Sequence, residues 1–313
     1  MPPKKSAKST RASGNSRGNS GARLYGPGPV VSLAWLMGAA ATAVAIGALG
    51  AYLVLCLLFY QNQAMLIFHP SRKISLTPAS EGLEYQAVAL DRTKAGTPQL
   101  TGWWIPAAKN ARYLKDTILY LHGASGSLSD AVGQIKALHA LGITIFALDY
   151  RGFGDSADLR PTEQSADADA LVAWQYLTVN RKIPPTGIIV FGQGAGASFA
   201  THLAARRTIA GLVLAEISPT ARTIFEHDQR ARLLPLFLLA NQRMDPGPEL
   251  MKWKGPKLFI DRPDKSTGGQ TVTRHDYTIA APPRQLASLP GATLDAVANA
   301  VQPFLQQVLP PAH

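Results

Sequence analysis

A short stretch of alternating glycines, residues 192–196 (GQGAG), most constrains what this chain can fold into. The residues before it, Ile188 to Phe191, form a short apolar, β-branched run that is typical of a buried strand. The residues after it, Ala197 to Ala205, are rich in Ala and Leu and favour a helix. A strand that passes directly into a helix through three glycines predicts a tight turn, with Gly194 at its centre.

Charge is distributed unevenly along the 313 residues, which carry a formal net charge of +11. Residues 1–24 contain six basic and no acidic side chains, and the rest of the chain has 25 basic against 20 acidic residues. This small excess argues against a nucleic-acid partner for the folded part. Residues 1–27 are basic and rich in Ser, Gly and Asn, and predict a disordered head.

A long uncharged segment follows the head. No Lys, Arg, Asp or Glu occurs between Arg23 and Arg72, and the segment from Val30 to Tyr60 is almost purely apolar. It exceeds the ~20 residues that span a bilayer and the ~7–15 apolar residues of a cleavable signal peptide. Residues 28–60 therefore predict one uncleaved transmembrane helix. The binding partner predicted for this segment is the lipid bilayer.

The orientation of this helix follows from the charges beside it. Basic residues precede the span and none follows it immediately, which predicts a cytoplasmic N-terminus and a periplasmic or extracellular domain on an inner or plasma membrane. The single cysteine, Cys56, lies within the span, so the sequence predicts an outer domain without a disulfide.

Residues 61–313 read as one domain in which apolar strand-like runs alternate with helical segments, an α/β pattern that predicts a mostly parallel sheet. Residues 221–251 interrupt the alternation, with apolar residues at helical spacing between Leu233 and Leu239. The expected strands are Glu84–Leu90, Gln99–Ile105, Thr117–Leu121, Ile143–Leu148, Ile188–Phe191, Gly211–Glu216, Lys257–Ile260 and Leu286–Leu289, and the expected helices include Ser165–Leu177 and Leu294–Val308.

Several motifs resemble those of the α/β-hydrolase family. The glycine turn is similar to the family's nucleophile elbow, G-x-S-x-G, and the run of residues 149–156 (DYRGFGDS) is similar to a structural loop of these enzymes. The exit segment LIFHPSR and the strand TGWWIPA resemble the start of membrane-anchored, Bem46-like and serine aminopeptidase-like hydrolases. The resemblance covers about residues 61–309 and implies an α/β-hydrolase fold, with residues 221–251 as a lid-like insertion.

The resemblance also implies positions for an oxyanion hole. The H-G dipeptide at His122 follows the strand Thr117–Leu121, and in the family the loop after it supplies a backbone N–H, which corresponds here to Ala124. The residue after the nucleophile supplies the second, which corresponds to Ala195. The side chains are irrelevant to this role because the donors are main-chain amides.

The catalytic triad implied by the resemblance is degenerate. A serine hydrolase needs a nucleophile, a histidine base and an acid that orients the base. The nucleophile position holds Gly194. The loop before the last helix contains no histidine, and Leu294 or Thr293 stands near its expected place. The acid position after the strand Lys257–Ile260 is irregular, with Asp264 as its nearest candidate.

Two alternatives remain open from the sequence. An active serine hydrolase, acting on ester or peptide bonds, would need a relocated nucleophile, for which Ser125, Ser198 and Ser218 are the candidates, and His275 would be the nearest upstream histidine. A dinucleotide-binding protein would use residues 192–197 as its G-x-G-x-x-A fingerprint and Glu216 as its ribose ligand.

The hypothesis that the residues favour is a single-pass membrane protein with an α/β-hydrolase domain that is catalytically inactive, a pseudoenzyme. Its role would be the binding of a small-molecule or protein ligand. No metal-binding spacing or cofactor motif other than the dinucleotide alternative occurs in the sequence, so we expect no metal and no cofactor.

Overall fold

A computed structural model of the chain describes residues 31–92, 94, 96–229, 231–263, 271–291 and 293–309. The chain divides into two compact units, Met1–Leu53 and Val54–His313. The described part of the first unit belongs to helix α1 (Leu33–Asn62), whose side chains there are exposed. The apolar helical stretch Leu33–Leu66 is long and apolar enough to cross a membrane.

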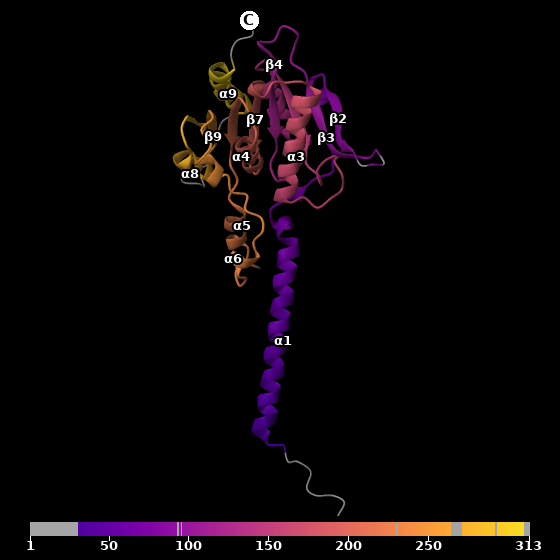
Figure 1. The fold of residues 1–313 in the computed structure, drawn as a ribbon, viewed down its shortest axis with the longest axis vertical. Coiled ribbons are helices and arrows are strands. Elements are labelled where there is room, and N and C mark those ends of the chain that lie inside the picture. The colour runs from indigo at the N-terminus through magenta and orange to yellow at the C-terminus, as the bar shows by residue number, and fades with distance from the viewer. Residues whose placement is uncertain are drawn as a thin grey trace, which may run out of the picture. The chain divides into compact units, whose positions relative to one another are not determined.

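The second unit is built on an eight-stranded sheet with the order β10-β9-β8-β7-β4-β6-β3-β2 (Figure 1). Strands β2 and β3 pair antiparallel, as do β3 and β6, and the remaining neighbours are parallel. The strands are β2 (Gln86–Arg92), β3 (Pro98–Ile105), β4 (Tyr113–Leu121), β6 (Ile143–Asp149), β7 (Ile188–Gln193), β8 (Gly211–Ala215), β9 (Lys257–Asp261) and β10 (Arg284–Ser288). The mostly parallel sheet predicted from the sequence is confirmed.

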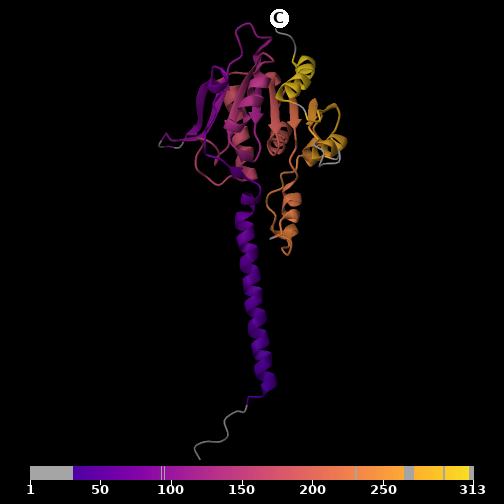
Figure 2. The ribbon, with the colours of Figure 1, turned by 180° about the vertical axis from the view of Figure 1, so that it is seen from behind.

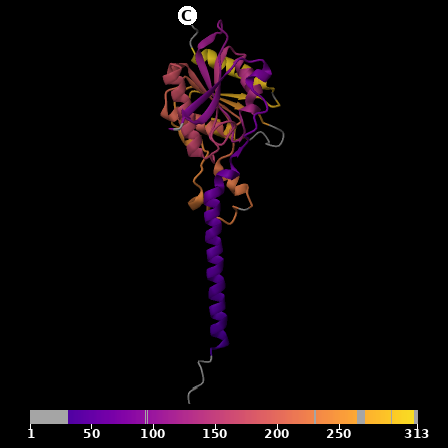
Figure 3. The same cartoon turned by 90° about the vertical axis from the view of Figure 1, so that its right-hand side faces the viewer.

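Helices pack on both faces of the sheet (Figure 3). Because successive strand residues point to opposite faces, Leu119 and Leu121 of β4 join one core cluster while Ile118 and Tyr120 join the other. Helices α3 (Glu163–Gln175) and α4 (Gly196–Arg206) cover the first face, and α2 (Leu128–His139) and α9 (Leu294–Val308) cover the second.

An excursion of the chain follows β8 and leaves the sheet on the side where the chain enters the domain (Figure 2), and we call it the lid. It contains α5 (Ala221–His227), α6 (Leu236–Leu239) and α7 (Gly247–Leu250). The predicted helical spacing from Leu233 to Leu239 forms a helix only from Leu236, because Pro235 takes the position before its first turn. Helix α8 (Val272–Ile279) lies between β9 and β10.

Shorter elements complete the described chain. The 3₁₀ turn η1 (Gln63–Leu66) continues α1, and β1 (His69–Pro70) pairs in parallel with β5 (Ser125–Gly126). This pairing holds the entry segment beside the loop that follows β4. The remaining short helices are η2 (Pro78–Glu81), η3 (Tyr176–Asn180) and η4 (Pro185–Gly187).

The outer glycines of the elbow are required by close packing. A Cβ added at Gly192 would lie 2.5 Å from the carbonyl oxygen of Gly196 and 2.6 Å from Cα of Ala197. A Cβ added at Gly196 would lie 2.5 Å from the carbonyl oxygen of His122. Helix α4 therefore starts directly against β7 and the end of β4.

We expect Gly192→Ala to destabilise the domain by about 1–3 kcal/mol, since overpacking a rigid contact costs that much. Gly123→Ala is the matched control, because its Cβ would meet nothing closer than 3.7 Å. The measurement is the urea unfolding midpoint of both variants. Equal midpoints for the two variants would contradict the close-packing argument.

Candidate functional site

The glycine turn has the strand–turn–helix geometry predicted from the sequence. Gly194 lies between β7 and α4 with φ of +58°, a left-handed conformation that glycine adopts without strain. Its N–H donates to the carbonyl oxygen of Ala215 at 2.9 Å, and its carbonyl accepts from the N–H of Ser218 at 3.3 Å. The turn is thus anchored to the end of β8.

A side chain at position 194 would point into the site. A Cβ built there would lie 3.3 Å from Oγ of Ser218 and 3.6 Å from Cα of Gly123, so there is nearly room for one. The wild-type chain presents only a hydrogen at this point. The elbow is therefore intact as a backbone structure and carries no nucleophile.

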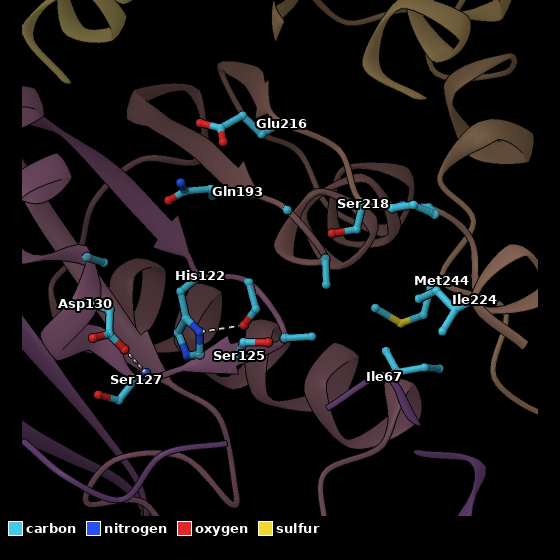
Figure 4. A pocket seen from close by; sticks show the side chains of 16 residues that line it. Ile67, His122, Ser125, Ser127, Asp130, Gln193, Glu216, Ser218, Ile224 and Met244 are labelled. Atoms are coloured by element: carbon cyan, nitrogen blue, oxygen red, sulfur yellow. Dashed lines mark hydrogen bonds between the residues drawn. The ribbon is translucent and has the colours of Figure 1, made fainter. Parts of the chain in front are cut away.

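A cavity of about 450 Å³ opens above the elbow, at the carboxyl ends of β4, β7 and β8 (Figure 4). Polar groups line one side of it, among them Gln193, Glu216 and Ser218. Ile67 and the lid residues Ile224 and Met244 gather on another side, as Figure 4 shows. The cavity thus combines a polar half with an apolar half, as ligand sites commonly do.

Two main-chain amides of the cavity have no internal acceptor. Ala124 and Ala195 both line the cavity. Within the described part of the chain, neither N–H donates a hydrogen bond, although the carbonyl of Ala124 accepts from His69 at 2.8 Å. Ala195 also immediately precedes α4, where the helix dipole favours negative charge. These are the two residues that the sequence assigned to an oxyanion hole.

His122 is buried beneath the cavity and is neutral. Burial lowers the pKa of its imidazole from 6.5 to about 4, despite the opposing effect of a 2.7 Å contact between Nδ1 and the carbonyl oxygen of Gly123. Its Nε2 lies 3.5 Å from Oδ1 of Asp149. Burial raises the pKa of Asp149 from 3.8 to about 7, although the N–H of Leu128 donates to this carboxyl group. Between about pH 4 and about pH 7, these pKa values make the two groups a neutral pair and not an ion pair.

Two further contacts fix the polar side of the cavity. The phenol of Tyr120, which is buried, donates to Oε1 of Gln193. Glu216 accepts a 2.8 Å hydrogen bond from Nη1 of Arg262, which offsets the charge of its carboxylate. Glu216 and Gln193 thus both have partners supplied by the fold.

The described residues at the expected base and acid positions form no catalytic pair. Leu294 is the first residue of α9 and packs toward α2, where a Cβ on Gly133 would approach its Cδ1 to 2.9 Å. Asp264 lies outside the described residues. The preceding carboxylate, Asp261, is buried and already accepts from Thr271 Oγ1 at 2.6 Å and from Arg274 Nε at 3.0 Å.

The other serines and histidine lack a nucleophile–base arrangement. Ser125 and Ser218 line the cavity, whereas Ser198 is buried within α4. Among the described residues, no histidine nitrogen is hydrogen-bonded to any of these hydroxyls, and the nitrogens of His122 face Gly123 and Asp149 instead. His275 lies on α8 beside a different hollow.

Residues 149–156 are interpreted from the sequence as a structural loop, and their contacts agree with this interpretation. Arg151 forms an ion pair with the buried Asp169, and Ser156 Oγ donates to the carbonyl oxygen of Asp149 at 2.7 Å. Sequence reasoning missed the proximity of His122 and Asp149. The available signal was that each ends a neighbouring parallel strand, β4 or β6.

Comparisons with known proteins agree with this geometry. The model of the alpha/beta hydrolase family matches residues 118–309. The uncharacterized protein Rv2307c of Mycobacterium tuberculosis is 34% identical over 171 residues, which cover 55% of this chain and 59% of that protein. A lysophosphatidylserine lipase of Danio rerio is 34% identical over 115 residues, which cover 34% of this chain and 29% of the lipase. The chain thus spans less than two thirds of these relatives.

Solved structures show the same fold. An alpha-beta hydrolase from Vibrio vulnificus superposes with a TM-score of 0.58 at 22% identity, covering 76% of this chain and 87% of that one. The esterase Pf2001 of Pyrococcus furiosus has a TM-score of 0.57 at 19% identity, covering 78% and 98%. The chain belongs to the α/β-hydrolase family. This assignment replaces the dinucleotide-binding alternative.

The pair of buried groups makes a prediction about pH. In the unfolded chain, His122 is charged below about pH 6.5 and Asp149 is ionised above about pH 3.8, whereas in the folded chain the proton resides on Asp149. Between about pH 4 and about pH 6.5, both states of the chain therefore hold one proton on this pair. The pair's contribution to the free energy of unfolding is then nearly independent of pH in this window.

Asp149→Asn removes the carboxyl group that holds the pair's proton in the folded chain. The unfolded variant takes up a proton on His122 that the folded variant does not, so its stability relative to wild type should fall as the pH is lowered from about 7 to about 4. The slope is at most ~1.4 kcal/mol per pH unit. Urea unfolding across this range measures it, with Asp158→Asn, at a side chain that is 86% exposed, as the control. Parallel curves for Asp149→Asn and wild type would refute the neutral pair.

Proposed function

We propose that this chain is a membrane-anchored member of the family that has lost serine hydrolysis and binds the carbonyl or carboxylate group of an acyl lipid. One observation carries the proposal. Ala124 and Ala195 line a cavity, and their amides have no acceptor within the described part of the chain, at an elbow whose central residue, Gly194, has no side chain.

The chemistry of these groups supports binding without reaction. Two N–H donors and the N-terminus of α4 favour an oxygen atom that carries negative or partial negative charge. Hydrolysis also requires a nucleophile next to a base. Gly194 supplies no nucleophile, and the buried His122 has its nitrogens turned to Gly123 and Asp149. A bound carbonyl would therefore be held and not attacked.

The apolar side of the cavity is the reason for proposing an acyl lipid as the ligand. Ile67, Ile224 and Met244 provide an apolar side opposite the polar groups (Figure 4), which suits a ligand with a polar head and a hydrocarbon chain. The Danio rerio relative is a lysophosphatidylserine lipase, which supports the same class. No nucleic-acid role is proposed.

The proposed anchor is the apolar helix α1. Its length and composition suit a bilayer span, and six basic residues precede it. The positive-inside rule then places the N-terminus in the cytoplasm and the hydrolase-fold domain on the outer side. A topology reporter fused after His313 tests this, and activity of a reporter that works only in the cytoplasm would contradict the orientation.

We expect no covalent labelling of the wild-type chain by a fluorophosphonate probe. Gly194→Ser should also lack normal activity, staying near the ~10³–10⁴-fold acceleration over water that an incomplete triad leaves. It should lower the free energy of unfolding by ~1–2 kcal/mol, because serine takes on the strain of a positive φ. Adding Thr293→His or Leu294→His to this variant tests whether a base near the family position raises the rate. Strong labelling of wild type at Ser125 or Ser218 would support the active-hydrolase alternative.

Binding is tested with a fluorescent long-chain fatty acid. Ala195→Pro removes one of the two donors, and the φ of −64° at this position suits proline. Losing a hydrogen bond to a carboxylate should weaken binding by roughly tenfold to a hundredfold. Leu294→Pro, at the first position of α9, is the matched helix-start control and should bind as wild type does. Unchanged affinity in Ala195→Pro would contradict the proposed site.

A further inference from the structure

Two separate segments are hydrogen-bonded to the point where α1 ends. Nε2 of Gln63 donates to the carbonyl oxygen of Leu239 at 3.0 Å, and Oε1 of the same side chain accepts from the N–H of Asn241 at 2.9 Å. Nη1 of Arg160 donates to the carbonyl oxygen of Gln61 at 2.8 Å. The lid and the loop 157–161 are therefore both held at the end of the apolar helix.

Side-chain packing strengthens this attachment. The ring of Phe59, in the last turns of α1, meets the ring of Phe225 in α5 edge to face at a centroid distance of 5.3 Å. Cys56 is only 9% exposed and belongs to the core cluster that contains Phe225. The end of α1, from Val54 onward, belongs to the same compact unit as the domain, and the lid packs on it through Phe225.

Large apolar side chains are exposed on the segments attached there. Phe237 is 83% exposed and Leu238 is 70% exposed, both on α6 of the lid. Met65 of η1 is 56% exposed and Leu159 is 50% exposed, and these two share a hollow with Arg160. Apolar side chains that gather on one part of a surface mark an interaction site.

We propose that these four residues, Met65, Leu159, Phe237 and Leu238, form a membrane footprint that seats the domain on the bilayer in which α1 is anchored. The proposal rests on the proposed span and goes beyond ligand binding in the cavity. The footprint residues would lie at the boundary between head groups and acyl chains, where interfacial apolar side chains insert by ~5–10 Å.

The bilayer is the occupant that the chain's continuity favours over a protein partner. The apolar helix leaves the domain where these segments meet, so the lipid surface begins next to them. Figure 1 shows α5 and α6 beside the end of α1 that carries Phe59, in agreement with the contacts of that residue. Exposed apolar side chains at that level would be buried in lipid, which is favourable because it removes apolar surface from water.

Charge around the footprint is mixed. Arg222 and Arg243 line a hollow with Phe237, and Asp245 lines the same hollow. Arg222 also forms a 2.7 Å ion pair with Glu226, and Asp158 lies beside Leu159 in the other hollow. Apolar burial, and not attraction to anionic lipid, therefore carries the proposal. It follows that zwitterionic lipid should suffice.

The test is a fluorescent depth measurement on the full-length chain. Cys56 is the only cysteine in the sequence, so Cys56→Ala gives a background for single labelling sites. Leu238→Cys and Leu159→Cys each receive an environment-sensitive nitrobenzoxadiazole probe. The protein is reconstituted into phosphatidylcholine vesicles with and without a nitroxide-labelled phosphatidylcholine. We expect blue-shifted emission and loss of most of the signal to the nitroxide at both sites.

Val179→Cys is the matched control. Val179 is 70% exposed, as is Leu238. It lies in η3, which leads into the amino end of β7, whereas the lid follows the carboxyl end of the parallel neighbour β8. Its probe should keep water-like emission and resist the nitroxide. The footprint is overturned if the probes at 238 and 159 behave like the probe at 179. A flotation experiment distinguishes an absent footprint from an α1 that does not span the bilayer. A chain that is not anchored would not float with the vesicles in a density gradient.

Discussion

The close approach of α4 to β7 and β4 is the contact on which the rest of the structure depends. It exists because Gly192 and Gly196 lack side chains, so that the first turn of the helix lies against the ends of two central strands. That approach places Ala195 at the wall of the cavity and brings the loop after β4 beside the elbow. Gly194 completes the turn at a positive φ. A residue with a side chain would be strained at this position, whereas glycine adopts the conformation without strain.

Retention of the turn separates two functions that a hydrolase combines. Nucleophilic attack needs a side chain at position 194 and a histidine beside it, and neither is present among the described residues of the site. Oxygen binding needs only backbone donors, and these remain at Ala124 and Ala195. Because the backbone donors come from the fold itself, they survive substitutions that remove the catalytic side chains. A binding role is the function that this remaining chemistry supports.

The lid joins the cavity to the end of α1. It contributes Ile224 and Met244 to the cavity, and it contacts the end of α1 through Phe225 and the partners of Gln63. Glu163 at the start of α3 accepts from the N–H groups of Arg243 and Met244, which fixes the return of the lid to the domain. The lid thus supplies two of the three named residues on the apolar side of the cavity, Ile224 and Met244, and part of the proposed membrane footprint.

The sequence by itself determined the fold class, the elbow and the apolar helix. Apolar periodicity and glycine spacing are local properties, so they can be read along the chain. Only the tertiary structure decided that Asp261 is held by Arg274, that His122 and Asp149 form a neutral buried pair, and that the lid packs on the end of α1. These features depend on burial and on contacts between distant segments, because desolvation sets which protonation state a group adopts. No spacing in the sequence encodes how deeply a side chain is buried.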